Sequence, residues 1–422
     1  MTPWLVSAAR RAPAVVAVES EGVSLAYADL LARARLADLG AAAGERVAVA
    51  LPAGVDFVVA LWAVLLRRAV LVPVDLRLSP EEQAARLAGT RILVREPLGG
   101  QSDPLHTGMV DLGQSLAVLH PSGTTAAPKP VELTWRNFQA SALGSAVALG
   151  LDRAERWLCP MPLVHVGGLS VAIRSAIYAT TAVLHERFDT DRVLAELSDP
   201  GRRITLVSLV PTMLARLLDA GLREPPTLRW ALLGGGPIAP ALLARAEAAG
   251  VPVAPTYGMT EASSQIATFG WPLPGTEVRI DGAGEILVRG DTVAPRSVAG
   301  DGWLHTGDLG RFGAEGRLEI TGRAADTIVT GGENVAPAEV EAVLLEHPAV
   351  ADAGVYARPD VQWGEAVVAA VVARAGEPAD PAAIRAHCAA RLAGYKVPKE
   401  IRLVDGLPRT PSGKLLRREL AA

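Results

Sequence analysis

The stretch from Arg46 to Val74 reads RVAVALPAGVDFVVALWAVLLRRAVLVPV and decides the fold class. Two short apolar segments, Arg46–Leu51 and Val70–Val74, have the length and branched side chains of buried strands. Between them, Val55–Arg68 is long and apolar enough to form a buried helix. A strand, a helix and a strand in this order form a βαβ unit, whose two strands pair in parallel. The sequence therefore predicts an α/β protein whose parallel sheets are covered by helices.

The same alternation returns in the middle of the chain. The expected strands are Ile204–Val210, Trp230–Leu233 and Val251–Thr256, and the expected helices between them are Thr212–Ala220 and Ala239–Ala249. Strands that alternate with helices in this way are typical of a doubly wound layer. The large N-terminal part of the protein is therefore expected to contain doubly wound sheets.

The pattern changes twice toward the C-terminus. From about Pro272 short, turn-rich segments such as Gly284–Val288 predict a small antiparallel barrel or sheet. After Arg323 a helix, two strands, a helix and a strand predict a small, mobile α+β domain. We therefore expect an N-terminal domain over residues 1–322 and a C-terminal domain over residues 323–422.

Composition narrows the class of protein. Of 422 residues half are apolar, and the net charge of -4, with no long Lys/Arg stripe, argues against a nucleic-acid-binding protein. The apolar stretch after Arg10 and Arg11 is too short for a secretory signal, and the run Phe57–Leu66 is too short to span a membrane. Cys159 and Cys388 lack the spacing of a zinc site or disulfide framework. We expect a cytoplasmic enzyme that acts on small molecules.

The first motif follows the apolar residues Leu116–Leu119 and reads HPSGTTAAPKP over residues 120–130. Its hydroxyl, glycine and lysine residues offer several donors for phosphate oxygens, namely Ser122, Gly123, Thr124, Thr125 and Lys129. The loop is not a Walker A motif, because no glycine precedes Lys129 and Pro130 follows it. Taken alone, the segment is as typical of a polar surface turn as of a phosphate-binding loop.

The second motif, TYGMTEASSQ over residues 256–265, stands at the end of a predicted strand. Ligands of open α/β sheets bind beside the carboxyl ends of the strands. At that position Glu261 can hold Mg²⁺ and Tyr257 can stack on a base, although Glu261 could equally be a carboxylate at a helix N-terminus.

Three later segments add further candidates. Residues 302–310 place Asp308 in a tight glycine turn, where its carboxylate could accept hydrogen bonds from sugar hydroxyls. Residues 322–335 are rich in glycine and lie where the composition changes, as expected of a hinge. Residues 408–418 carry Lys414 on a Pro/Gly/Ser loop, whose simplest alternative is a solvated basic tail.

These five segments, in this order, resemble the signature motifs of the adenylate-forming superfamily, which includes acyl-CoA synthetases, peptide-synthetase adenylation domains and firefly luciferase. The resemblance implies ATP and CoA as substrates, Mg²⁺ as the metal, and a C-terminal domain that rotates between two half-reactions. It implies catalytic roles for Lys129, Thr260, Glu261 and Lys414. It also implies nucleotide or CoA binding by the phosphate-loop residues and by Gly235, Gly236, Tyr257, Gly258, Asp308, Arg323, Gly331 and Gly332. Ala126 and Pro130 replace glycines common in the family, and Ala325 replaces a charged hinge residue.

A narrower match concerns the acid. The segment Met161–Tyr178, together with residues 232–237 and 257–267, resembles the o-succinylbenzoate-CoA ligases of menaquinone biosynthesis. Their substrate carries a second carboxylate that needs a partner if it is buried. Arg174 is the expected partner, with a helix-surface cation as the alternative. His165, Gly234 and Ser263 are expected to line the same pocket, with ordinary core packing as a nearly equal alternative for His165.

Other functions remain open from the sequence. The chain could be another aryl- or acyl-CoA ligase, or an adenylation enzyme that loads a carrier protein, although no carrier segment follows Ala422. A nucleotide-binding regulatory protein without turnover is disfavoured because the residues expected to bear charge are present. The oligomeric state and the resting domain orientation are not predicted, and a homo-oligomer is possible.

Overall fold

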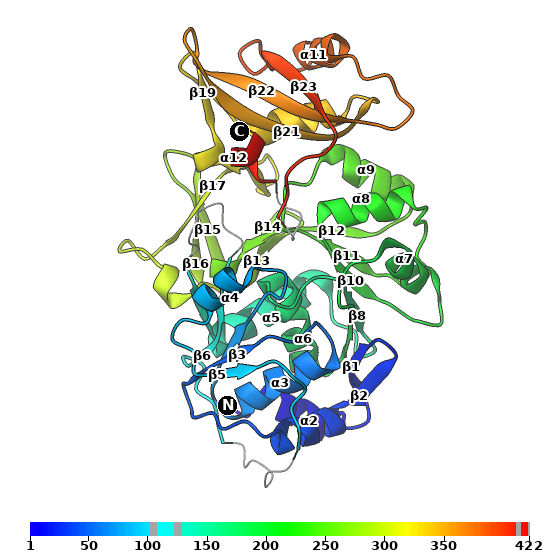
Figure 1. The fold of residues 1–422 in the computed structure, drawn as a ribbon, viewed down its shortest axis with the longest axis vertical. Coiled ribbons are helices and arrows are strands. Elements are labelled where there is room, and N and C mark those ends of the chain that lie inside the picture. Colours follow the sequence, from blue (N-terminus) through cyan, green and yellow to red (C-terminus); the bar gives the residue numbers. More distant parts are fainter. Residues whose placement is uncertain (101–107, 122–128, 411–414, 421–422) are drawn as a thin grey trace. The chain divides into compact units, whose positions relative to one another are not determined.

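The computed structural model describes residues 1–100, 108–121, 129–410 and 415–420 (Figure 1). The chain forms two compact units. The first contains residues 1–235, 249–277 and 288–304, and the second contains residues 236–248, 278–287 and 305–422.

Parallel sheets dominate the first unit, as the sequence predicts. Within the described residues the larger sheet has nine strands. Its order is β14 (Trp271–Pro272), β13 (Ser264–Thr268), β12 (Val253–Met259), β11 (Trp230–Leu233), β10 (Leu206–Leu209), β8 (Arg156–Cys159), β9 (Thr181–Leu184), β1 (Val16–Ser20) and β2 (Val23–Ala26). Strands β12, β11, β10, β8, β9 and β1 pair in parallel. Their carboxyl ends therefore meet at one edge.

The second sheet of this unit contains the predicted βαβ unit. Among the described strands its order is β5 (Ile92–Val94), β3 (Arg46–Val49), β4 (Val70–Pro73), β6 (Ser115–Leu119) and β7 (Val131–Thr134). Arg46 pairs with Val70 in a parallel register that continues to Val49 and Pro73. The expected parallel pairing is confirmed.

Helices fill the space around these sheets. The crossover helix α3 (Val55–Leu66) is buried along almost its whole length, because it is apolar on every side. Helices α5 (Trp135–Leu149) and α6 (Val166–Tyr178) pack side by side in the same core (Figure 1). The remaining helices of this unit are α1 (Trp4–Arg11), α2 (Tyr27–Leu36), α4 (Pro80–Arg86), α7 (Thr190–Ser198) and α8 (Pro211–Asp219).

Helix α5 begins at a defined cap. The Thr134 side chain accepts a hydrogen bond from the Asn137 backbone N–H, and the Asn137 side chain accepts one from the Thr134 backbone N–H. This capping box satisfies backbone donors that the first helical turn leaves unpaired. The Asn137 amide also donates to the Val293 carbonyl over 2.8 Å, which fixes the helix against a distant loop.

The C-terminal third is built from smaller sheets. The described strands β15 (Thr276–Ile280), β16 (Glu285–Gly290), β17 (Leu304–Phe312) and β18 (Leu318–Arg323) form a four-stranded sheet in that order. A mixed sheet follows, built from β20 (Glu333–Val335), β19 (Ile328–Thr330), β22 (Gly364–Ala373), β21 (Val350–Asp360) and β23 (Glu400–Val404). The second unit also contains helices α9 (Pro240–Ala248), α10 (Pro337–Leu345), α11 (Pro381–Ala389) and α12 (Arg417–Leu420).

The expected helix, strand, strand, helix and strand are α10, β21, β22, α11 and β23. The short hairpin of β19 and β20, which precedes them, was not predicted. No helix in the described ranges is both long and apolar enough to cross a bilayer. Both cysteines are free and buried.

Candidate functional site

Several predicted residues gather at the carboxyl edge of the nine-stranded sheet. Gly234 and Gly235 follow β11, Tyr257 and Gly258 lie on β12, and His165 lies beyond β8. Because these three strands are parallel members of one sheet, their carboxyl ends lie at the same edge. The structure therefore brings together residues whose proximity the sequence only implied.

The glycines at this edge are required by close packing. A Cβ atom on Gly234 would lie 2.7 Å from the Thr256 Cγ2 atom, and one on Gly258 would lie 1.6 Å from the Ser264 carbonyl oxygen. Gly235 has a φ of +81°, which L side chains rarely adopt. At Gly234 and Gly258 the segments after β11 and within β12 pack more closely than any side chain would permit.

Glu261 lies on a short, tightly constrained turn. Residues Thr260–Ala262 form a single 3₁₀ turn, and the next two residues, Ser263 and Ser264, have φ values of +51° and +91°. The Glu261 backbone carbonyl accepts a hydrogen bond from the Ala294 N–H over 2.8 Å. No other described residue makes a hydrogen bond or ion pair with its carboxylate. A carboxylate without a partner among the described residues is a suitable ligand for Mg²⁺. This ion usually binds one or two protein carboxylates together with substrate phosphates.

His165 joins the edges of the two sheets. It is the residue before α6, and its Nε2 atom lies 3.5 Å from the Nη2 atom of Arg77, which follows β4 of the other sheet. Arg77 in turn donates to both carboxylate oxygens of Asp75, over 2.8 and 2.6 Å. Burial, followed by the Arg77 charge, lowers the pKa of His165 to about 4. His165 is therefore neutral at pH 7, and its Nε2 atom can accept a hydrogen bond from Arg77.

Arg174 is buried, which rules out the surface alternative. Its exposure is only 2%, and its Nη2 atom donates to the Ser141 Oγ atom over 2.8 Å. The guanidinium carbon lies 5.7 Å from the centre of a Trp157 ring, a cation–π contact. Burial lowers the pKa of Arg174 to about 10, so the group stays charged at pH 7.

No described carboxylate forms an ion pair with this guanidinium, and its Nε atom is buried without a hydrogen-bond acceptor. Buried arginines are normally paired, so an anion that enters this region would meet an unsatisfied cation.

The phosphate loop lies largely outside the described residues. Ser122, Gly123, Thr124 and Thr125 belong to the undescribed segment, and Lys129, just after it, is exposed. His120, at the start of the motif, follows β6 at the carboxyl edge of the five-stranded sheet. Burial, followed by the charges of Arg86 and Arg46, lowers the pKa of His120 to about 4.

In the second unit Asp308 and Arg323 face each other. They occupy paired positions on β17 and β18, and the Arg323 Nε atom donates to an Asp308 carboxylate oxygen over 2.8 Å. The expectation that Asp308 sits in a glycine turn is wrong, because Leu304–Phe312 is a continuous strand. Gly307 nevertheless has a φ of +68°, and its N–H donates to the Glu285 carboxylate. Gly236, also in this unit, precedes α9.

Gly331 and Gly332 form the two-residue turn between β19 and β20. Both have positive φ values, +59° and +84°, which the tight turns of hairpins favour. A Cβ atom on Gly331 would lie 3.1 Å from the Trp363 ring. Lys414 lies outside the described residues.

The chain on either side of Lys414 is anchored. Arg409 donates to both carboxylate oxygens of Asp352, each over 2.8 Å, and Arg417 forms ion pairs with Glu341 and Asp326. These pairs hold the described residues before 411 and after 414 on the C-terminal sheet and on α10.

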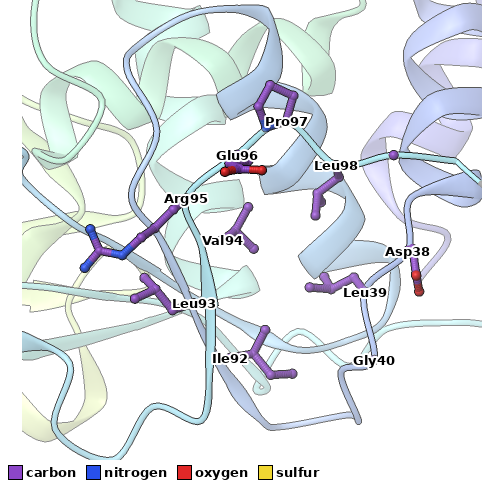
Figure 2. Close-up of a pocket in the computed structure, with 11 residues that line it drawn as sticks. Asp38, Leu39, Gly40, Ile92, Leu93, Val94, Arg95, Glu96, Pro97 and Leu98 are labelled. Carbon is purple, nitrogen blue, oxygen red and sulfur yellow. The ribbon is translucent and has the colours of Figure 1, made fainter.

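One described pocket lies elsewhere. It has a volume of about 650 Å³, and Figure 2 shows residues 38–40 and 92–98 facing each other across it. It borders β5, the edge strand of the five-stranded sheet, and none of the predicted site residues lines it. We assign it no function.

Two residues of the site were not predicted. Arg77 follows a buried strand, and a charged residue at the carboxyl end of a parallel strand could have been singled out from the sequence. Ser141 lies within α5 in a run of small residues, and nothing in the sequence distinguishes it from its neighbours.

Comparison with known proteins identifies the family of this chain. Residues 5–95 and 100–296 match the AMP-binding enzyme family, and residues 339–414 match the AMP-binding enzyme C-terminal domain. The chain belongs to the AMP-binding enzyme family. This membership confirms the superfamily that the five sequence motifs indicated.

The similarity to individual family members extends over the whole chain. The 2-succinylbenzoate–CoA ligase of Bacillus licheniformis is 37% identical, with 99% of this chain and 98% of that protein covered. The o-succinylbenzoate CoA synthetase of Bacillus subtilis, solved with its acyl-adenylate intermediate, is 34% identical with a TM-score of 0.92, covering 100% of this chain and 98% of that one. ATP-bound MatB from Rhodopseudomonas palustris is 25% identical, with a TM-score of 0.88 and coverages of 100% and 98%.

Proposed function

We propose that this chain is an acid–thiol ligase that uses ATP to activate 2-succinylbenzoate as an acyl-adenylate and then transfers the acyl group to CoA. The products are 2-succinylbenzoyl-CoA, AMP and pyrophosphate. The relatives with this name align with the chain from end to end at 35–37% identity. A solved relative is in complex with ATP and magnesium ion, which supports the same nucleotide and metal here.

The observation that carries the choice of acid is the buried, charged guanidinium of Arg174. Only one carboxylate of this substrate is activated, so the other must be neutralised if it is buried. The unsatisfied Arg174 Nε atom suits that carboxylate, because a charge-assisted hydrogen bond is among the strongest available in a protein. Fatty acids carry no second anion and would leave this cation unpaired.

Further polar atoms support a buried site for an anion. Ser170 lies one helical turn before Arg174 on α6, and its Oγ atom is buried without a partner among the described residues. The Ser263 Oγ atom is likewise buried without a partner among the described residues. A hydroxyl group donates hydrogen bonds to carboxylates, and ordered water can satisfy the remaining groups.

We propose the following roles at the nucleotide. Glu261, with Thr260 beside it, would hold Mg²⁺, which supplies positive charge to the phosphate oxygens. Ser122, Gly123, Thr124, Thr125 and Lys129 would donate hydrogen bonds to the phosphates, and Lys414 would stabilise the charge that develops as the carboxylate attacks. Asp308 and Arg323 would bind the ribose, because a carboxylate accepts hydrogen bonds from sugar hydroxyls. Gly234, Gly235, Gly236, Tyr257 and Gly258 would line the adenine and acyl sites, with His165 at the acid.

The second half-reaction is proposed to follow the family pattern. Gly331 and Gly332 would border the path of the CoA thiol, because the position of a Cβ atom on Gly332 is open space, which leaves room for a narrow ligand. We propose residues 1–322 and 323–422 as the two functional domains, with rotation of the second bringing CoA to the adenylate. A cytoplasmic location and function without a nucleic-acid partner are part of the same proposal, and a homo-oligomer is compatible with it.

The test is release of AMP and pyrophosphate over a panel of acids, with and without CoA. We expect 2-succinylbenzoate to give the highest kcat/KM and to yield a thioester only when CoA is present. Fatty acids, benzoate and malonate serve as comparisons. Preference for any of these over 2-succinylbenzoate would refute the assigned acid, and no AMP from any acid would refute the proposed reaction.

A further inference from the structure

The backbone carbonyl of Ser263 is buried in a turn and needs a hydrogen-bond donor from the protein. It belongs to the turn that carries Glu261, where Ser263 and Ser264 both have positive φ values. Ser263 is fully buried, so its carbonyl oxygen needs a hydrogen-bond donor from the protein. The Ser141 hydroxyl of α5 supplies that donor over 2.6 Å.

The Ser141 hydroxyl has one proton, and its two contacts fix where that proton points. Arg174 Nη2 can only donate, so the Ser141 oxygen accepts from it over 2.8 Å. The hydroxyl proton is then committed to the Ser263 carbonyl. A chain of two hydrogen bonds thus runs from the buried guanidinium, through α5, to the turn of Glu261.

All members of this chain are shielded from water. Ser141 is 1% exposed, Arg174 2% and Ser263 0%. In such surroundings hydrogen bonds polarise one another, because little solvent screens them. Pairing of the guanidinium with an anion therefore alters the strength of the bond that holds the turn.

From this geometry we propose that Ser141 is a positioning residue that couples acid binding at Arg174 to Mg²⁺-nucleotide binding at Glu261. The inference rests on the proposed function, because it takes Arg174 as the site of the second carboxylate. When that carboxylate pairs with Arg174, the guanidinium is held in place, and with it the hydroxyl and the turn. Each ligand then binds to a site that the other has already ordered.

A purely structural role for Ser141 predicts a different result. If the hydroxyl only caps a buried carbonyl, its loss weakens the fold and each binding step independently. Under the coupling role, loss of the hydroxyl removes the mutual enhancement between the two ligands. Binding measured with one ligand in the presence and absence of the other separates these roles.

The experiment is calorimetric titration of the full chain with a magnesium complex of α,β-methylene-ATP, which prevents turnover, in the absence and presence of saturating 2-succinylbenzoate. In the wild type we expect the acid to tighten nucleotide binding by about 5- to 150-fold, the usual range for coupled sites. In Ser141→Ala we expect this factor to approach one. Ser145→Ala, one turn further along α5 and also 1% exposed, is the matched control and should keep the wild-type factor.

A second single variant keeps the test decisive if Ser141→Ala is poorly folded, and where Ser141→Ala folds the two variants form a double-mutant cycle. Arg174→Met leaves the Ser141 hydroxyl in place and should lose the same coupling, and the double variant should lose no more than either single variant. An undiminished factor in either single variant, or no factor in the wild type, overturns the inference. Failure of the wild type to form AMP would instead overturn the proposed function.

Discussion

Replacing Arg174 with methionine should separate stability from activity. Methionine approximates the length of the arginine stem without its charge, so the core keeps most of its packing. The Ser141 hydroxyl keeps its acceptor, the Ser263 carbonyl, and no buried carboxylate among the described residues loses a partner. The folded chain therefore loses a buried cation without creating an unpaired anion.

The changes in the free energy of unfolding caused by Arg174→Met nearly cancel or add up to a more stable variant. The lost hydrogen bond to Ser141 involves a charged donor and contributes about 1.5–3 kcal/mol. The lost contact with Trp157 contributes about 0.5–2 kcal/mol. These two losses are opposed by a gain, because the variant avoids the free-energy penalty of desolvating an unpaired ion. That penalty is several kcal/mol. We expect an unchanged or higher melting temperature in the absence of ligand.

The effect on the reaction should be large and specific for the second carboxylate. Removing one partner of a buried charge pair typically costs about 2–5 kcal/mol, which corresponds to roughly 30-fold or more in the KM of the acid. The KM of ATP should change much less. An analogue of the substrate that lacks the second carboxylate should be used by Arg174→Met at least as well as by the wild type.

Steady-state pyrophosphate release gives the KM values, and thermal unfolding of the same preparations gives the melting temperature. Arg216→Met is the matched control, because Arg216 lies exposed on α8 and its loss should change neither value. An unchanged KM for 2-succinylbenzoate in Arg174→Met would remove Arg174 from the acid site. A strongly lowered melting temperature would show that the cation stabilises the fold.

Three further predictions concern other parts of the chain. Lys414→Ala should abolish adenylate formation yet still convert supplied acyl-adenylate to thioester in single-turnover assays, and equal loss of both half-reactions would contradict its role. The pKa of His165 is lowered to about 4, mainly by burial, whereas it is about 6.5 in an unfolded chain, so stability should fall as the pH decreases between these values. His165→Asn should make that decline shallower in urea denaturation, and an identical slope would rule out this contribution. Gly258→Ala should lower the free energy of unfolding by about 1–3 kcal/mol or more, because its Cβ atom would overlap the Ser264 carbonyl oxygen. Gly40→Ala is the control, because a Cβ atom there would lie in open space. Equal urea midpoints for the two variants would refute the close packing at Gly258.

Local patterns predicted most of the elements. The strand Trp230–Leu233 was predicted with its observed bounds, and α3 was predicted from Val55 to Arg68 against an observed end at Leu66. These elements are long or strongly apolar, so their periodicity and length identify them. The hairpin of β19 and β20 was missed because its glycine pair was interpreted as a hinge, although two glycines between short strands also indicate a two-residue turn.

The sequence by itself determined the α/β class, the order of the elements and the family, because hydrophobic periodicity and short motifs are properties of neighbouring residues. Only the tertiary structure decided which distant side chains meet. Ser141 and Ser263 are separated by 122 positions and Arg77 and His165 by 88, and the packing of sheets and helices brings each pair together. The tertiary structure also decided whether Arg174 is exposed or buried. An arginine on a helix is a surface cation if nothing packs against it, and it becomes a buried charge if other elements cover it.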